Sequence, residues 1–416
     1  MAGRSERPLN IGLNLYMLQP HVGGIANYAQ TLLREWHAFY PDDTLVPFTF
    51  DHNEEMMAEL PASVRRAEIR VKVQEQILCH AGRLDVYFCP FGGLYPRPFP
   101  RPSVVTIVDM QERFFPEFFT EQELRSRLYH FDGSLNSADM VATISDFSRQ
   151  SMLEILDAPP DKVRAIHLCP DALPAADRRP ALPADWPADF AFFPAQDWPH
   201  KNHARLLEAL VLLRKRDGRR IPFVFTGGWQ QAGRVERLMA EHGLQDQTLH
   251  LGRVGRAELA WLYRHARLLV FPTLFEGFGI PLVEAMRSGL PIVCSGTSSL
   301  PEVAGDAAVY CDPLDANSIA RTVLRAWDSP ALRAELQAAG ARRAALFNEE
   351  HLVREHRRVF LEAIRRFSWK GLLQRWLERS RRRKPAPDDS IIPRDHLLRA
   401  KFLLDNQRKK MFLSKD

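Results

Sequence analysis

The sequence has few cysteines and no long apolar run, and each absence excludes a class of protein. The 416 residues include five cysteines, an odd number, and no Cys-x-x-Cys pair. This pattern argues against a disulfide framework or a cysteine-held metal and favours reduced thiols in the core. No apolar run reaches the ~18 residues that a membrane-spanning helix needs, and the N-terminal residues lack the apolar core of a signal peptide. A cytosolic protein is therefore expected.

The net charge of +5 is unevenly distributed along the chain. Residues 365–416 contain 16 Lys and Arg against 6 Asp and Glu, a charge of +10, whereas residues 1–364 carry −5. A basic segment of this kind points to an anionic partner, either phospholipid headgroups or nucleic acid. The 45% hydrophobic and 26% charged content is that of a globular protein, and the length suits two domains with separate cores.

Short apolar stretches alternate with helical segments, which predicts an α/β protein with doubly wound parallel sheets. A stretch rich in Pro, Ala and Asp at 171–187 separates the two halves. In the first half, strands are expected at 9–16, 86–88, 104–108, 140–144 and 163–167. In the second half, they are expected at 190–194, 222–226, 248–251, 268–271, 291–294 and 308–310. Helices are expected at 25–37 and 204–215, among others.

The most informative segment is one in which an apolar strand passes through a glycine-containing loop into a helix. Glu276 is expected in the loop and Glu284 in the first turns of the helix, with seven residues between them. Gly277, Phe278 and Gly279 form a tight loop whose glycines let the backbone approach a ligand. The free N–H groups of a helix start favour an anion, and a carboxylate there can accept hydrogen bonds from sugar hydroxyls. A helix cap with one solvated glutamate is the alternative.

This segment resembles the E-x(7)-E motif of retaining glycosyltransferases with the GT-B fold, the large glycosyltransferase family 4 with its mannosyltransferases. The resemblance covers roughly residues 9–360 and includes 194–210 and 289–308. It implies two Rossmann-like domains facing across a cleft, with ligands at the carboxyl ends of the strands. The expected parts are an acceptor-binding domain at 1–175, a linker at 176–188, a nucleotide-sugar-binding domain at 189–350, C-terminal helices at 351–384 and a basic tail at 385–416.

Lys201 follows an expected strand and opens a helix, where a cation opposes the helix dipole and needs an anion for compensation. By resemblance it matches the lysine that binds the donor diphosphate. Many family members carry an arginine six positions earlier, where this chain has Ala195. His200 or Arg205 is expected to supply the missing positive charge. A solvated surface lysine is the alternative.

The resemblance also implies roles for the two glutamates and for two further loops. Glu276 would position the donor sugar and support its developing positive charge, and Glu284 would bind the nucleotide ribose. The other expected donor contacts come from backbone groups and hydroxyls, at Arg253, Val254, Ser298, Ser299 and Leu300. An ordinary turn with a helix cap explains residues 298–300 about equally well.

The first half is expected to bind the acceptor. Gly23 and Gly24 resemble the glycine loop that lets donor phosphate or acceptor approach the backbone. Asp109 lies in a segment where family members carry a histidine before the aspartate, and here that position is Val108. Either Asp109 alone has the local role, or the donor is a deoxy sugar that lacks the hydroxyl that the histidine would contact. A strand-end capping role for Asp109 is the alternative.

No Asp-x-Asp pair occurs, so the metal motif of the other major glycosyltransferase fold is absent. No metal and no cofactor are therefore expected beyond a GDP- or UDP-linked sugar, and Lys201, helix ends and backbone amides are expected to meet the diphosphate charge. The resemblance implies transfer with retention, with Glu276, Asp109 and Lys201 as the catalytic residues. The expected product is a lipid-linked surface polysaccharide or lipopolysaccharide, built from mannose or a related hexose.

Other functions remain open. A hydrolase or epimerase of the same fold is the main alternative, and a phosphorylase would need a cofactor lysine and a longer chain. A nucleic-acid-binding protein is suggested only by the basic tail, and no nucleic acid is expected. Helical spacing places Trp369, Leu372, Leu373 and Trp376 on one face beside basic residues, which is typical of a helix lying at a membrane surface. Packing of this face onto the N-terminal domain is the alternative.

Overall fold

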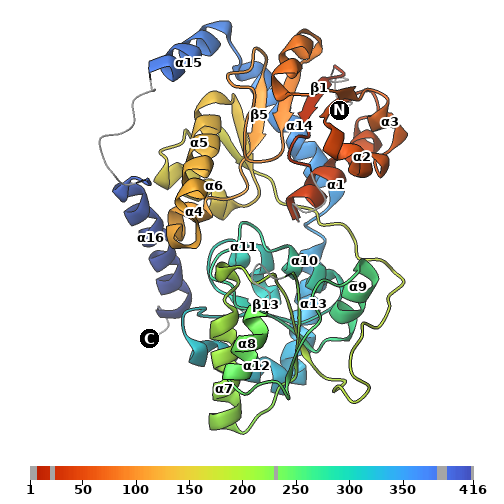
Figure 1. The fold of residues 1–416 in the computed structure, drawn as a ribbon, viewed down its shortest axis with the longest axis vertical. Helices are drawn as coiled ribbons and strands as arrows, with labels where there is room; N and C mark the ends of the chain where they lie inside the picture. Colours follow the sequence, from red (N-terminus) through yellow and green to blue (C-terminus); the bar gives the residue numbers. More distant parts are fainter. Residues whose placement is uncertain (1–6, 19–23, 229–232, 382–390, 414–416) are drawn as a thin grey trace. The chain divides into compact units, whose positions relative to one another are not determined.

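The computed structural model of the chain describes residues 7–18, 24–228, 233–381 and 391–413 (Figure 1). The chain forms two compact units. Unit 1 comprises Met1–Pro170 and Asn348–Ala400, and unit 2 comprises Asp171–Phe347 and Lys401–Asp416. Both are parallel α/β units, so the predicted fold class of doubly wound sheets is confirmed.

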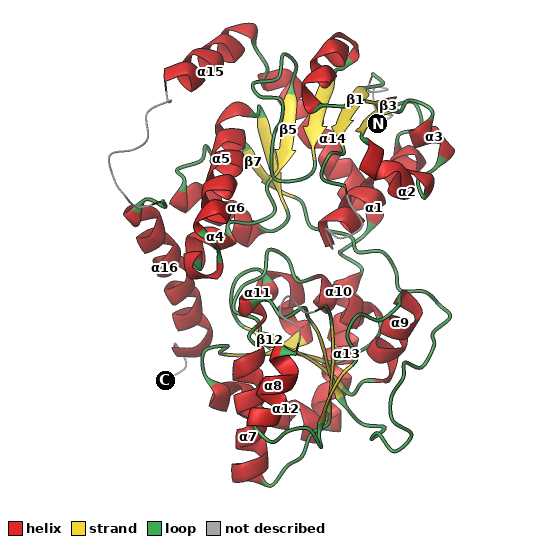
Figure 2. Cartoon of the chain, in the orientation of Figure 1, coloured by secondary structure: helices red, strands yellow, loops and turns green. Residues whose placement is uncertain are grey.

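Unit 1 contains a seven-stranded, wholly parallel sheet in the order β3-β2-β1-β4-β5-β6-β7, with helices on both of its sides (Figure 2). Its strands are β1 (Asn10–Asn14), β2 (Thr44–Thr49), β3 (Ile69–Arg70), β4 (Val86–Cys89), β5 (Ser103–Thr106), β6 (Met140–Thr143) and β7 (Val163–Ala165). Its helices include α1 (Gly24–Phe39), α2 (Glu54–Ala58), α3 (Ala62–Arg65), α4 (Gln111–Phe114), α5 (Glu121–Ser137) and α6 (Asp146–Ile155). Strands β4, β5 and β6 are buried at every position, as expected for a sheet covered on both faces.

Unit 2 contains a six-stranded parallel sheet in the order β10-β9-β8-β11-β12-β13. Its strands are β8 (Ala191–Pro194), β9 (Phe223–Thr226), β10 (Thr248–His250), β11 (Leu268–Phe271), β12 (Ile292–Ser295) and β13 (Ala308–Cys311). Its helices are α7 (His203–Asp217), α8 (Arg234–Glu241), α9 (Arg256–His265), α10 (Ile280–Arg287), α11 (Leu300–Ala304), α12 (Ala316–Asp328) and α13 (Pro330–Ala344). This order is that of a Rossmann sheet, in which the connections change direction between the first and fourth strands, here β8 and β11.

The C-terminal part of the chain returns to unit 1 through α14 (Glu349–Arg366) and α15 (Trp369–Arg381). Asn348 caps α14, because its side-chain oxygen accepts the backbone N–H of His351 at 2.8 Å. Arg357 projects from α14 into the core, where its Nε donates to the carboxylate of Asp43 at 2.9 Å. Both side chains are at most 3% exposed. The following helix, α16 (Arg394–Arg408), belongs to unit 1 up to Ala400 and to unit 2 from Lys401.

Two strands of unit 1, β2 and β3, were not predicted from the sequence, and the strands predicted at 9–16, 104–108, 140–144 and 163–167 end one to two residues earlier in the structure. Strand β2 contains Pro47, which cannot donate to a neighbouring strand, but β3 pairs only with Phe48 and Thr49. Pro47 therefore lies where β2 is still the edge of the sheet, which is where proline is tolerated. The first strand ends at Asn14 and not at residue 16, because the Asn14 side chain accepts the N–H of Tyr16 at 3.0 Å and turns the chain.

The buried Arg357 provides a test of how α14 is held. Arg357→Ala leaves the carboxylate of Asp43 buried without its cation, so we expect it to lower the free energy of unfolding by about 3–5 kcal/mol. Arg358 is the matched control, because it is the next residue of the same helix and its side chain is 71% exposed. Arg358→Ala should change stability by less than about 0.5 kcal/mol. Equal urea midpoints for the two variants would contradict this account of the Arg357–Asp43 pair.

Candidate functional site

The two loops that carry the predicted catalytic groups of unit 2 follow the strands β8 and β11. Ligands of doubly wound sheets bind at the carboxyl ends of the strands where the connections change direction. The loop after β8 leads through a short helical turn, η4 (Pro199–Lys201), into α7. The loop after β11 contains Glu276 and leads into α10. Parallel pairing of β8 and β11 therefore brings the ends of both loops to the same edge of the sheet.

Lys201 and Glu276 meet at this edge. Lys201 Nζ lies 2.7 Å from Glu276 Oε1, although the two residues are 75 positions apart. The lysine side chain is 17% and the glutamate side chain 11% exposed, so the pair is accessible but largely shielded from water. Lys201 Nζ also lies 5.4 Å from the centre of the Phe271 ring at the end of β11. A cation and a carboxylate held together in this way can meet an anion and a hydroxyl-bearing group of one ligand.

Asn202 holds the turn that presents Lys201, and the sequence analysis did not identify it. Its backbone is left-handed, with φ +66°, a conformation that asparagine tolerates better than most residues. Its side-chain amide donates to the carbonyls of Pro272 and Pro313, both at 2.8 Å. Asn202 thus ties the start of α7 to the chain beyond β11 and beyond β13. Asparagine between a lysine and an expected helix was the only sequence signal for this role.

The Glu276 loop is held by hydroxyls from the segment between β12 and α11. Ser298 Oγ accepts the Glu276 N–H at 3.0 Å. Ser299 Oγ lies within hydrogen-bond distance of two carbonyls, those of Glu276 and Phe278, at 2.9 Å each. Both serines are buried, as is Leu300, the first residue of α11. In this structure the hydroxyls position the loop, and the predicted contribution of residues 298–300 to phosphate binding stays a prediction.

The predicted glycine-containing loop leads into α10 as expected from the sequence. Gly279 has φ +102°, and a Cβ at this position would lie 2.6 Å from Leu300 Cδ2. Its left-handed conformation therefore favours glycine, and a side chain here would also displace Leu300. Phe278 is buried, and its ring meets that of Phe347 edge-on, with 5.5 Å between ring centres. The aromatic side chain thus anchors the loop in the core, so that contact between Phe278 and a donor is left to its backbone.

Glu284 is the fifth residue of α10, and Tyr263 on α9 reaches it. The Tyr263 hydroxyl donates to Glu284 Oε2 at 2.7 Å. Burial raises the pKa of Glu284, and the Tyr263 hydrogen bond together with the charges of Arg256 and Arg287 opposes this rise. Tyr263 was missed in the sequence analysis, because an aromatic residue at helical spacing is typical of a core position. The predicted role of Glu284 in binding the nucleotide ribose stays a prediction.

The residues expected to assist Lys201 have other partners. Arg205 lies 2.8 Å from Glu208, and both side chains are about 40% exposed. The backbone carbonyl of His200 accepts the N–H of Leu274 at 2.7 Å and so joins the two loops. Neither geometry tests the predicted contribution to the diphosphate site. Burial lowers the pKa of His203 to about 3, and its ring packs 4.8 Å from that of Phe193, so His203 is a neutral core residue.

The remaining predicted site residues lie in loops and at helix starts. Arg253 is exposed and Val254 half-buried, in the loop between β10 and α9. Helix α1 begins at Gly24, and Gly23 lies outside the described residues. In unit 1, Asp109 follows β5, and its Oδ1 accepts the backbone N–H of Gln111 at 3.1 Å, so it does form a capping contact. Roles in binding for these residues stay predictions.

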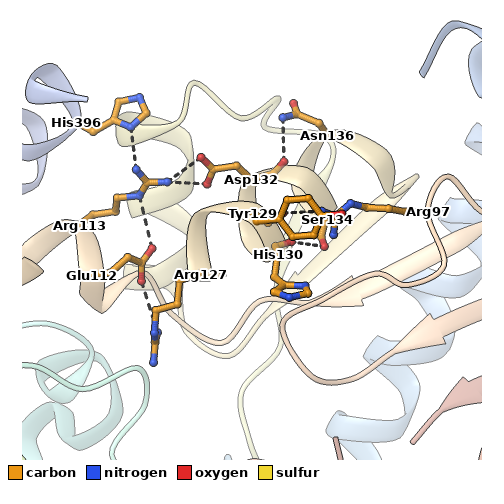
Figure 3. Close-up of polar contacts among 10 residues, drawn as sticks. All are labelled: Arg97, Glu112, Arg113, Arg127, Tyr129, His130, Asp132, Ser134, Asn136 and His396. Atoms are coloured by element: carbon orange, nitrogen blue, oxygen red, sulfur yellow. Dashed lines mark hydrogen bonds and ion pairs between the residues drawn. The ribbon is translucent and has the colours of Figure 1, made fainter. Parts of the chain in front are cut away.

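A network of charged side chains, centred on the buried Glu112 and Arg113, lies in unit 1 (Figure 3). Arg113 is fully buried and donates to both carboxylate oxygens of Asp132, at 2.6 and 2.8 Å. Its other terminal nitrogen lies 3.2 Å from His396 Nδ1 on α16. Glu112 is 1% exposed, and burial raises its pKa to about 7, against the lowering effect of Arg127 and Arg113. No sequence motif predicted this network, since its members lie on three separate helices, α4, α5 and α16.

Glu112 predicts a pH dependence of stability. Its pKa in the folded protein, about 7, lies above the usual value of 4.5 for glutamate, so the folded state keeps a proton that the unfolded state releases between these values. The free energy of unfolding should therefore fall as the pH rises from about 4.5 to 7, by about 3 kcal/mol from this group. Glu112→Gln should remove that part of the fall, whereas Glu117→Gln at an exposed position should retain it. A Glu112→Gln variant with the wild-type slope in urea titrations would contradict the assignment.

Comparison with known proteins identifies the family. Residues 178–343 match the model of the glycosyl transferases group 1. The chain is 32% identical over 263 residues to the O-antigen chain mannosyltransferase B of Escherichia coli. This alignment covers 60% of this chain and 67% of that protein. The chain belongs to the group 1 glycosyl transferases. It is also 33% identical over 231 residues to the serotype-specific mannosyltransferase WbdA of Escherichia coli, but this covers only 28% of that protein's length.

Solved structures show the same fold at low sequence identity. Sucrose-phosphate synthase from Thermosynechococcus elongatus aligns with a TM-score of 0.65 and 19% identity, covering 86% of this chain and 99% of that one. WaaG, a glycosyltransferase involved in lipopolysaccharide biosynthesis, aligns with a TM-score of 0.62 and 16% identity, covering 83% and 98%. The two Rossmann-like units are therefore those of the GT-B fold. Among the described residues, no helix has the length and apolar content needed to cross a membrane.

Proposed function

We propose that this protein transfers a hexose from a nucleotide sugar to a glycan or lipid-linked acceptor, with retention of configuration and without a metal. The observation that carries the proposal is the Lys201–Glu276 pair at the carboxyl ends of β8 and β11. A nucleotide sugar presents a diphosphate next to a ring with hydroxyls, and these are the two chemical groups that a paired cation and carboxylate can bind. Membership of the group 1 glycosyl transferases supports the same reaction class.

The proposed mechanism follows from the charges at this edge of the sheet. Lys201 would leave Glu276 for the donor diphosphate and stabilise the charge of the departing nucleotide. Glu276, then free of its cation, would orient the sugar and stabilise positive charge at its anomeric carbon. The acceptor hydroxyl would attack on the face from which the nucleotide leaves, and the leaving phosphate would take its proton. Glu284 would bind the ribose, with Tyr263 fixing its carboxylate.

The donor that we favour is GDP-mannose or a related GDP- or UDP-hexose. One relative is named as an O-antigen chain mannosyltransferase and another as a serotype-specific mannosyltransferase, which supports mannose as the sugar and a surface polysaccharide as the product. A 6-deoxyhexose is the alternative sugar, because Val108 occupies the position of the family histidine and provides no imidazole to contact a sugar hydroxyl. We propose that the protein acts in the cytosol, at the inner face of the plasma membrane. A nucleotide-sugar hydrolase or epimerase remains the second candidate, and its products would distinguish it.

The site residues give a direct test. We expect Glu276→Ala and Lys201→Ala each to lower turnover on the order of 10²-fold, because each removes a charge that stabilises the transition state. Arg205→Ala reports whether that residue adds to the diphosphate site. The donor is first identified by thermal stabilisation with a panel of GDP- and UDP-hexoses and their 6-deoxy forms. Near-normal transfer by both variants would refute the site, and loss of transfer on adding a chelator would refute the metal-independent mechanism.

The exposed apolar face of helix α15 supports the proposal that the protein binds a membrane surface. Its apolar side chains Trp369, Leu373, Trp376 and Leu377 are 61%, 57%, 55% and 42% exposed and follow helical spacing on one face. Leu372, which the sequence analysis placed on the same face, is half-buried, so packing of part of this face onto unit 1 stays the alternative. Arg375 ties the helix to unit 1, through a 3.0 Å hydrogen bond to the buried Asp139. We propose that the exposed face lies at an anionic membrane surface, because the surrounding segment is strongly basic.

Vesicle binding tests this surface. Burying one leucine side chain contributes about 1.5–3 kcal/mol, so Leu373→Glu should weaken binding to phosphatidylglycerol vesicles about tenfold or more. Leu346 is the matched control, since it is 54% exposed and lies in unit 2. Leu346→Glu should bind the vesicles like the wild type. Raised salt should weaken the binding of this variant and of the wild type, because it screens the attraction between the basic segment and the anionic lipid. Equal binding by Leu373→Glu and the wild type would place the membrane contact elsewhere.

A further inference from the structure

The end of α16 contacts the serine segment that holds the Glu276 loop. Gln407 Oε1 accepts the backbone N–H of Ser298 at 2.7 Å, and Gln407 Nε2 donates to the Ser298 carbonyl at 2.8 Å. One side-chain amide thus satisfies both backbone polar groups of a residue 109 positions away. The contact lies within unit 2, to which residues from Lys401 onward belong.

The conformation of Ser298 explains why this double contact matters. Its φ is +54°, in the left-handed region, which costs roughly 1–2 kcal/mol for a residue with a side chain. Such a conformation persists only where surrounding contacts maintain it. Held in this way, Ser298 presents its Oγ to the Glu276 N–H at 3.0 Å. A continuous series of contacts therefore runs from Gln407 through Ser298 to Glu276 and on to Lys201.

Other residues of unit 2 also contact the C-terminal segment, residues 407–412. Arg408 lies 2.7 Å from Asp312, just beyond β13. Gly296, just beyond β12, leaves the space that Met411 and Phe412 occupy, and a Cβ there would overlap both side chains. These contacts are independent of Gln407, and they place the same segment on the same edge of the sheet. The segment therefore belongs to this part of unit 2.

We propose that Gln407 is a positioning residue of the donor site. By holding Ser298 in its left-handed conformation, Gln407 fixes the Glu276 backbone and hence the carboxylate that meets the donor sugar. The inference rests on the proposed transfer from a nucleotide sugar. It extends the site to a part of the chain beyond residues 178–343, the segment that matches the family model.

Kinetics of full-length variants test the positioning role. Gln407→Leu keeps the bulk but removes both hydrogen bonds, and we expect about a tenfold loss of kcat/KM, with donor KM raised and acceptor KM unchanged. Gln407→Glu keeps only the acceptor for the Ser298 N–H, so its loss should be smaller. Lys409→Ala, at an exposed position of the same segment, should match the wild type. In a Ser298→Ala background, Gln407→Leu should have less effect than alone, because both act through the same hydroxyl.

Hydrogen exchange tests the contacts without any substrate. The Glu276 amide should exchange faster in Gln407→Leu than in the wild type or Lys409→Ala, while β8 and β11 stay protected. Unchanged exchange at Glu276, or a loss of kcat with unchanged donor KM, would overturn the positioning role. Tighter donor binding by Gln407→Leu would also overturn it, by showing that Gln407 competes with the donor for the Ser298 N–H. If the wild type transfers from no nucleotide sugar but Glu276 still exchanges faster in Gln407→Leu, the proposed function would be refuted. The positioning contact between Gln407 and Ser298 would then still stand.

Discussion

The candidate site depends on one constraint, the need to satisfy the backbone polar groups of the loop after β11. Residues 272–279 lie between β11 and α10, outside any strand or helix, and unsatisfied N–H and carbonyl groups are costly where water is largely excluded. Ser298 and Ser299 meet that need with their hydroxyls, and so they determine where the Glu276 backbone lies. The Glu276 carboxylate can then reach Lys201, whose own turn is held by Asn202. The ion pair is thus the result of backbone satisfaction in two adjacent loops.

Unit 1 uses a different physical solution, in which cations of the C-terminal helices meet carboxylates that immediately precede strands of the sheet. Arg357 of α14 pairs with Asp43, and Arg375 of α15 with Asp139. Burial raises the pKa of both aspartates, so each arginine compensates a charge that would otherwise be unfavourable there. Such pairs add little net stability compared with apolar packing, but losing one partner is costly. They therefore specify where the returning helices attach, and they leave the apolar face of α15 exposed.

Local patterns of sequence were sufficient for most elements and for the two loops that meet at the candidate site. The strand of β11 was predicted with its observed bounds, because a short apolar run between turn residues has few other conformations. Glu276, Glu284 and Lys201 were predicted as site residues because each lies beside a strand end or helix start with a recognisable turn, and the structure brings Glu276 and Lys201 together. Strand β2 was missed because Pro47 argues against a strand, and only the pairing of β3 shows that Pro47 lies at an edge.

The sequence by itself determined the α/β class, the resemblance to GT-B glycosyltransferases and the loops that carry the site, since these depend on residues close together in the chain. Only the tertiary structure decided which groups meet. Tyr263 with Glu284, Arg113 with Asp132 and His396, and Gln407 with Ser298 each join segments that no periodicity relates. These residue types are common in helices and loops, so the sequence around each of them does not indicate its partner. Their roles come from burial, which makes a polar group require a partner, and from the parallel sheets, which bring distant loops to one edge.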